Sequence, residues 1–128
     1  MIGEYNDENC PVDATIQSLT NKWVLQIIKD LFMGKKKFSE FKKDKPHLTN
    51  KALSRCLKHM ETNGLIEKIT IDSKIEYKLS PKGLKLNKVL YELIIFSIDI
   101  DENEDYDKSK IKDSYKKLLI DSSDATTL

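Results

Sequence analysis

Several kinds of residue are scarce in this chain of 128 residues, and each scarcity excludes a class of protein. Two cysteines are too few for the disulfide framework of a small secreted domain. Four glycines and three prolines are few for an all-β sandwich with many tight turns. The longest apolar stretch, residues 93–98, is far shorter than the roughly 18 residues of a membrane span. With no signal peptide in sight, we expect a cytoplasmic protein without membrane contact.

Motifs of catalysis are also missing from the sequence. It contains no Gly-rich phosphate loop, no paired metal-binding histidines and no nucleophile motif. Cys56 and His59 are three residues apart and could both bind a metal, but two ligands are too few for a structural zinc. The other histidine, His47, is expected in a turn. We therefore expect neither an enzyme nor a metal or cofactor site.

Charge is unevenly distributed along the chain, although its net value is only +1. Residues 1–98 carry 17 basic and 12 acidic side chains, whereas residues 99–128 carry 5 and 9. The densest basic segment is residues 35–60, with nine basic side chains against two acidic ones. Such a field attracts a polyanion. A solvated helical face would have the same composition, so charge alone leaves both interpretations open.

Four helices are predicted in the first half of the chain. Pro11 can occupy the first position of a helix, because its missing N–H would have no partner there. Ile16 and Leu19 of this helix are expected to face inward. Apolar residues spaced i, i+3, i+4 and i+7 indicate a second helix, which Gly34 ends, and Thr49 is a suitable N-cap for the fourth. The expected ranges are 11–19, 22–33, 39–43 and 50–62.

The second half predicts a hairpin and two more helices. Strict alternation over residues 75–79 is typical of a half-buried strand, and residues 66–71 are its natural antiparallel partner across the turn Asp72-Ser73-Lys74. A long helix over residues 81–98 follows, with an apolar stripe wider than one small core can cover. After an acidic break, a last amphipathic helix is expected over residues 108–120.

This order of elements is that of a winged helix-turn-helix, a mainly α fold with a small β-hairpin (α+β). In such a fold the polar face of one helix can enter a major groove about 12 Å wide. The basic segment falls on this helix-turn-helix, which favours double-stranded DNA as the partner. We expect the winged helix-turn-helix, with its dimerisation helices, at residues 1–98. Residues 99–128 are expected to form an acidic linker and a C-terminal amphipathic helix or tail.

Short motifs make the interpretation more specific. They are Cys10-Pro11-Val12, Lys22-Trp23, Gly34, Lys37-Phe38-Ser39-Glu40-Phe41, Leu48-Thr49-Asn50-Lys51-Ala52-Leu53-Ser54-Arg55-Cys56-Leu57, Asn63-Gly64-Leu65-Ile66 and Tyr77-Lys78-Leu79-Ser80-Pro81-Lys82-Gly83. In this order they resemble the HxlR-type transcription regulators, a branch of the MarR-like winged-helix proteins, over about residues 10–98. The resemblance implies a homodimer, built from N- and C-terminal helices, that binds operator DNA. The chain departs from the family in its short hairpin turn and at Asn21, where the family usually has Gly.

The candidate DNA contacts lie on three predicted elements. The first two turns of the fourth helix should meet base edges, where Arg can bond bidentately to guanine and Asn to adenine. Lysines after the second helix and at the hairpin tip are placed to hold phosphates. Any of these side chains could instead simply face solvent. The full set is Lys35, Lys36, Lys37, Thr49, Asn50, Lys51, Ser54, Arg55, Lys58 and Lys74.

Cys10 is a candidate for thiol-redox sensing. A helix N-terminus favours the thiolate, and the resemblance includes redox and electrophile sensors with a cysteine at this position. Acidic residues at positions 4, 7, 8 and 13 oppose ionisation, so an unreactive structural cysteine is the alternative. Cys56 lies on the apolar face of its helix and is interpreted as a core residue.

Two functions of different classes follow from these observations. The first is a sequence-specific, homodimeric transcriptional regulator on a near-palindromic operator, with an oxidant or a small molecule as effector. The alternative is a winged-helix protein–protein interaction module without specific DNA binding. Partner-binding modules tend to lose the basic residues of the recognition face, whereas Lys51, Arg55 and Lys58 are present here.

Overall fold

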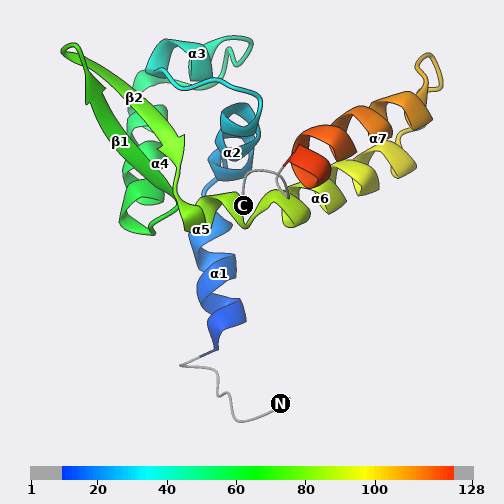
Figure 1. Ribbon diagram of the computed structural model, residues 1–128, viewed down its shortest axis with the longest axis horizontal. Helices are drawn as coiled ribbons and strands as arrows, with labels where there is room; N and C mark the ends of the chain where they lie inside the picture. The colour runs from blue at the N-terminus through cyan, green and yellow to red at the C-terminus, as the bar shows by residue number, and fades with distance from the viewer. Residues whose placement is uncertain (1–9, 123–128) are drawn as a thin grey trace.

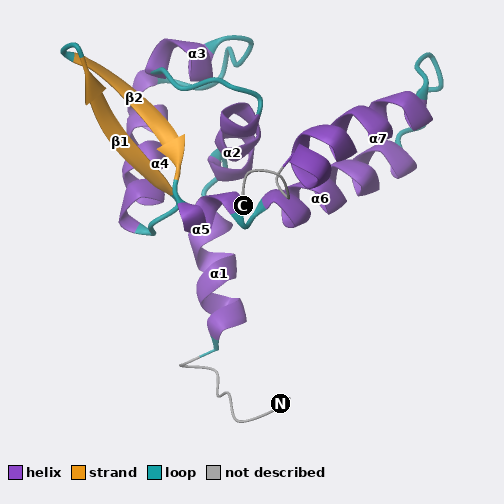
Figure 2. Ribbon diagram, in the orientation of Figure 1, coloured by secondary structure: helices purple, strands orange, loops and turns teal. Residues whose placement is uncertain are grey.

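The computed structural model describes residues 10–122. Their elements form one winged helix-turn-helix with a C-terminal helical hairpin (Figure 1). The predicted fold class, mainly α with one antiparallel β-hairpin, is confirmed (Figure 2). In chain order the elements are α1 (Pro11–Leu19), α2 (Val24–Phe32), α3 (Phe38–Lys42), α4 (Asn50–Thr62), β1 (Ile66–Ile71), β2 (Lys74–Leu79), α5 (Pro81–Leu84), α6 (Asn87–Ile100), α7 (Lys108–Lys116) and a π-helical turn, η1 (Lys117–Asp121).

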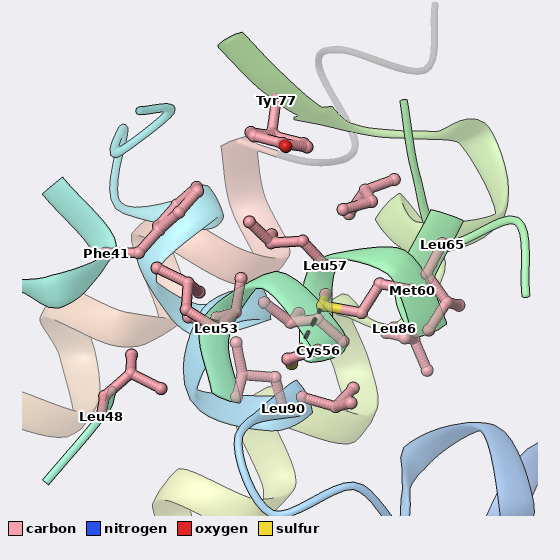
Figure 3. Close-up of a cluster of buried hydrophobic side chains, with 14 of the residues drawn as sticks. Phe41, Leu48, Leu53, Cys56, Leu57, Met60, Leu65, Tyr77, Leu86 and Leu90 are labelled. Carbon is pink, nitrogen blue, oxygen red and sulfur yellow. Dashed lines mark hydrogen bonds between the residues drawn. The ribbon is translucent and has the colours of Figure 1, made fainter. Parts of the chain in front are cut away.

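The hydrophobic core lies where α2, α4, the base of the hairpin and α6 meet. Figure 3 shows the inward residues of α4, among them Leu53 and Leu57, pointing into one cluster with Leu90 of α6. The rings of Phe41 and Tyr77 also belong to this cluster, with centroids 6.2 Å apart. Each fully buried side chain of this size contributes about 1.5–3 kcal/mol through removal of apolar surface from water. The core therefore holds α4 in place through the contacts of its inward face alone.

The hairpin closes with a two-residue turn. Asp72 and Ser73 have φ values of 50° and 66°, and two left-handed residues in succession match the right-handed twist of the strands. Lys74, which we predicted in the turn, already begins β2 and pairs with Ile71. The two-residue turn keeps the wing short.

The single helix predicted over residues 81–98 is wrong, because the chain breaks between α5 and α6. The backbone N–H groups of Lys85 and Leu86 donate to carbonyls three residues back, which tightens the turn there. Gly83 lies so close to the hairpin base that a Cβ would be 2.1 Å from the carbonyl oxygen of Leu65. The break brings Leu86 and Leu90 into the core with 9% and 2% exposure.

After the loop of residues 101–107, α7 and η1 fold back along α6 (Figure 1). Leu119 is 1% exposed, and its carbonyl accepts a hydrogen bond of 2.8 Å from Nδ2 of Asn87. The predicted last helix thus ends in a π-helical turn rather than as a regular α-helix. The outer face of α6 is left apolar and exposed, as the wide stripe in the sequence predicts. Its residues are Val89, Leu93, Phe96 and Ile100.

Helix α1 extends away from the winged-helix unit and meets it at its C-terminal end (Figure 1). Ser18 is buried there, whereas Val12 and Ile16 are 62% and 54% exposed. The prediction that Ile16 faces inward is therefore wrong, because no described element covers that side of α1. None of the described helices is both long and apolar enough to span a membrane.

Candidate nucleic-acid interface

Helix α4 has one buried face and one polar face, as predicted. Its N-terminus is capped by Thr49, whose hydroxyl oxygen accepts a 3.0 Å hydrogen bond from the backbone N–H of Ala52. Leu53, Cys56, Leu57 and Met60 face the core. The side chains of the opposite face are all exposed, namely Asn50, Lys51, Ser54, Arg55 and Lys58.

A buried ion pair holds the turn before α4 against α2. The Lys45 ammonium donates to the Asp30 carboxylate, and these side chains are only 10% and 9% exposed. Lys45 Nζ also donates to the carbonyl of Phe41 at 2.9 Å. The Lys45 carbonyl accepts from the backbone N–H of Leu48, next to the N-cap of α4. One residue therefore joins α2 and α3 through its side chain and the entry to α4 through its backbone carbonyl.

The start of α3 is fixed by Glu40. Its carboxylate accepts hydrogen bonds from the backbone N–H groups of Lys36 at 3.1 Å and Lys37 at 2.9 Å. The N–H of Lys36 is the largest cause that holds the pKa of Glu40 below its usual value, and the N–H and charge of Lys37 add to it. The three-lysine segment before α3 thus has an ordered backbone.

The three lysines of this segment differ in what they contact. Nζ of Lys35 lies 3.6 Å from Oδ1 of Asp30, and Nζ of Lys36 lies 3.8 Å from Oε2 of Glu76 on the wing. Lys37 is exposed, and no ion pair is found for it within residues 10–122. Of the three, Lys37 is therefore the most available for a phosphate, whereas Lys35 and Lys36 would have to exchange a carboxylate for it.

The wing is electrically balanced. Lys74, which we predicted as a phosphate contact, is exposed at the start of β2 beside the tip. Lys78 forms an ion pair of 3.4 Å with Glu67 across the two strands. The hairpin adds no net positive charge, because it contains as many acidic residues as lysines: Lys68, Lys74 and Lys78, and Glu67, Asp72 and Glu76. The basic side chains of the candidate interface are concentrated on α4 and on the segments before and after α3.

Lys42 belongs to this face, and sequence reasoning did not include it among the candidate contacts. Its ammonium donates a hydrogen bond to Oδ1 of Asn50. Lys42 ends α3 and Asn50 begins α4, so the contact crosses the turn of the helix-turn-helix. No spacing pattern in the sequence pairs two residues eight positions apart across a turn. The only signal was the membership of Lys42 in the basic segment.

The two cysteines occupy very different environments. Cys10 is the N-cap residue of α1, half-buried and free. Cys56 is completely buried, with its Sγ 3.8 Å from Sδ of Met60 (Figure 3). Burial raises the pKa of the Cys56 thiol to about 11, so it stays protonated near neutral pH. The acidic residues 4, 7 and 8 that we expected to oppose ionisation of Cys10 lie outside the described residues.

His59 links the recognition-type helix α4 to α1. Its Nε2 lies 2.9 Å from the carbonyl oxygen of Ser18, in the last turn of α1. Asn63 flanks the imidazole, with Nδ2 at 3.4 Å from Nδ1. Within residues 10–122 no three His, Cys, Asp or Glu side chains are grouped so that they could hold a metal ion. The His59 imidazole therefore has a hydrogen-bond partner in the last turn of α1.

Comparison with known proteins shows which family has this architecture. The HxlR-like helix-turn-helix family model matches residues 18–104. The HTH-type transcriptional regulator YtcD of Bacillus subtilis (strain 168) is 36% identical over 85 residues, which are 64% of this chain and 68% of YtcD. The crystal structure of YtcD matches with a TM-score of 0.65 at 33% identity, over 70% of this chain and 95% of that chain.

Two redox-related structures are also similar. The redox regulator HypR in its oxidized form has a TM-score of 0.67 at 25% identity, over 73% of this chain and 100% of that chain. The reduced form of the regulator YodB from B. subtilis has a TM-score of 0.62 at 29% identity, over 73% of this chain and 95% of that chain. Helix α7, which begins at Lys108, lies beyond the residues that the family model matches.

Proposed function

The chain belongs to the HxlR-like helix-turn-helix family of transcriptional regulators, and from this premise we propose that it is a sequence-specific DNA-binding regulator that acts as a homodimer. One observation carries the proposal: α4 turns a polar, basic face outward while its opposite face is fixed in the core. A helix in this position of a winged helix-turn-helix enters the major groove with its N-terminal residues on base edges.

Within this proposal the side chains of α4 divide into two roles. Asn50, Ser54 and Arg55 lie on the first two turns, where base edges are read. Lys51 and Lys58 are exposed point charges suited to phosphates, as are Lys37 and Lys74. The protein–protein module is disfavoured, because its surface needs no concentration of positive charge on this face.

DNA binding is tested by fluorescence anisotropy on duplexes selected from a randomised pool. Arg55→Ala should cost about 1–3 kcal/mol on the selected site and relax the base preference at one position. Lys116→Ala is the matched control, because it removes an exposed positive charge from α7, away from α4. Equal losses in the two variants would contradict the role of Arg55. Absence of duplex binding by the wild type at low salt would contradict the proposed function itself.

The homodimer is supported by two exposed apolar surfaces. One is the outer stripe of α6, and the other is the side of α1 that carries Val12 and Ile16. Contiguous exposed apolar surface of this kind commonly marks an interface, and two-fold pairing is the commonest solution for identical chains. A two-fold dimer would present its recognition helices roughly 34 Å apart, on a near-palindromic operator.

Thiol responsiveness through Cys10 is part of the proposal. It is supported by the half-buried position of Cys10 at the start of α1 and by the likeness to HypR, a redox regulator, and to YodB, which is also known in a diamide-treated form. Oxidation to a sulfenic acid or to a Cys10–Cys10 disulfide between protomers would change the relative position of the two recognition helices.

The test of this part is operator affinity before and after diamide or mild peroxide treatment. Wild type should lose or gain at least about fivefold in affinity, whereas Cys10→Ser should not respond, since Cys56 is buried as a protonated thiol. An identical change of affinity in the two proteins would mean that a residue other than Cys10 causes it. No response in either would leave Cys10 as a structural residue.

A further inference from the structure

Lys42 contacts the acceptor atom of a side chain that would otherwise read adenine. A free Asn reads adenine with both ends of its amide: Oδ1 accepts from N6, and Nδ2 donates to N7. In this protein Oδ1 of Asn50 already accepts from the Lys42 ammonium. The contact also decides the orientation of the amide, because an ammonium has only donors and must face the oxygen. Nδ2, with two hydrogens, is left for an external partner.

Oδ1 of Asn50 keeps a second lone pair, but the ammonium bound to the first repels a further amino donor, so the two side chains together present donors to an external partner. Nδ2 of Asn50 offers two N–H groups, and the Lys42 ammonium keeps two more besides the one directed at Oδ1. In the major groove guanine presents two acceptors, N7 and O6, whereas adenine presents one acceptor and one donor. A pair of side chains that presents donors therefore matches guanine. With adenine, the N6 amino group would have to approach Oδ1 beside the ammonium, which repels it, or the Lys42–Asn50 bond would have to break.

The position of Lys42 is set by the fold rather than by its side chain alone. It is the last residue of α3, and the preceding carbonyl, that of Phe41, accepts from the buried Lys45 ammonium at 2.9 Å. Asn50 is the first residue of α4, directly after the Thr49 cap. Both backbone positions are thus held by contacts other than the one between their side chains. Water exclusion in a DNA complex would strengthen this charge-assisted bond.

From this geometry we propose that Lys42 is a specificity-determining residue, which shifts the preference of Asn50 from adenine to guanine by placing an ammonium on its acceptor oxygen. The inference rests on the proposed function, in which α4 reads the major groove. It makes a prediction about base identity that DNA binding alone does not make. It also separates Lys42 from the neighbouring lysines, whose charge acts on phosphates and carries no sequence information.

The test begins by locating the base pair that Asn50 reads. Selected duplexes are compared between wild type and Asn50→Ala, and the position at which the variant loses its preference is the one read. Four duplexes that differ only at that base pair are then titrated with each protein. Wild type should favour guanine over adenine by about tenfold, the size of one good bidentate contact. Lys42→Met should abolish or invert this ratio, and Lys42→Arg, which keeps a cationic donor, should retain it.

Lys43→Met is the matched control. Lys43 is exposed and adjacent in the same basic segment, but the ammonium that contacts Asn50 is that of Lys42. The loss of Lys43 should therefore weaken binding to all four duplexes alike and leave the ratio unchanged. Wild-type preference for adenine, a ratio insensitive to Lys42→Met, or no position relaxed in Asn50→Ala would each overturn the inference while DNA binding stands. Absence of any selected duplex would overturn the proposed function together with it.

Discussion

At the scale of single residues, Asp30 and Lys45 depend on each other. Each is about nine-tenths shielded from water, and an isolated charge in that position would lose most of its hydration. Lys35, at 3.6 Å, gives Asp30 a second and more exposed base. Lys45 has no second acid among the described ion pairs, although the Phe41 carbonyl accepts from it. Loss of the Lys45 side chain should therefore lower the free energy of unfolding and loosen the turn that leads into α4.

We expect Lys45→Met to reduce the free energy of unfolding by on the order of 3 kcal/mol, because it leaves the Asp30 carboxylate buried without its main partner. Urea denaturation followed by circular dichroism measures the change. Lys117→Met is the matched control, since it breaks the exposed i, i+4 pair with Asp113 and should cost about 0.5 kcal/mol or less. If Asp30→Asn restored none of the stability lost in Lys45→Met, the cause would not be the unpaired carboxylate.

Asp30 and Asn50 show why part of the site could not be predicted from the sequence. The exposed face of α4 follows from helical periodicity, so Lys51 and Arg55 could be assigned to it from spacing alone. The partners of Asp30 and Asn50 come from other elements, and periodicity carries no information about them. A basic segment predicts that lysines are present, but only the folded chain separates Lys42, Lys45 and Lys37 into three different roles.

At the scale of elements, α5 is the joint between the wing and the C-terminal hairpin. Ser80 caps α5 by accepting a 3.0 Å hydrogen bond from the N–H of Gly83, and its own hydroxyl donates to the Gly64 carbonyl at the end of α4. Gly83 in turn packs against the carbonyl of Leu65. The joint is thus tied to the end of α4 by a capping serine and by the absence of a side chain at position 83.

Gly83→Ala should destabilise the protein by about 3 kcal/mol, because the added methyl would overlap the Leu65 carbonyl and push α5 away from β1. Lys85→Ala, on an exposed residue of the same turn, should stay within about 0.5 kcal/mol of wild type. Thermal unfolding of the two variants side by side measures the difference. A Gly83→Ala variant as stable as wild type would mean that α5 can shift without loss of packing.

Element boundaries were predictable where local chemistry determines them. Pro11 starts α1 and the Thr49 cap starts α4 at the expected residues, and β1 spans the expected range. The break between α5 and α6 could not be predicted, because the signal that continues across it, an apolar stripe, is the stronger local one. What bends the chain is a backbone approach between Gly83 and Leu65, which are adjacent only in the folded state.

At the scale of the whole molecule, the outer stripe of α6 should control assembly. Phe96 is 60% exposed, so Phe96→Glu removes little from the protomer core but places a charge in the proposed interface. We expect the wild type to be dimeric at micromolar concentration and Phe96→Glu to shift toward monomer. Light scattering coupled to gel filtration measures both masses.

Ile75→Glu is the matched control for this experiment. Ile75 is 47% exposed on the wing, so the same chemical change there should leave the mass unaltered. A monomeric wild type, or a dimer that Phe96→Glu does not weaken, would exclude α6 as the principal interface.

The contact between His59 and Ser18 has a mechanical consequence. From Ser18 back to Cys10 the arm of α1 measures about 12 Å, and from His59 back to Asn50 the arm of α4 measures about 13 Å, at 1.5 Å per residue. These two helical segments are of nearly equal length and meet at the contact between His59 and Ser18. A rotation about that contact would therefore move Cys10 and Asn50 by nearly equal distances. If α1 and the winged-helix unit turn together as a rigid body, a displacement of about 2 Å at Cys10 becomes about 2 Å at Asn50, with no amplification and little loss. A hydrogen bond to a base edge tolerates only a fraction of that distance.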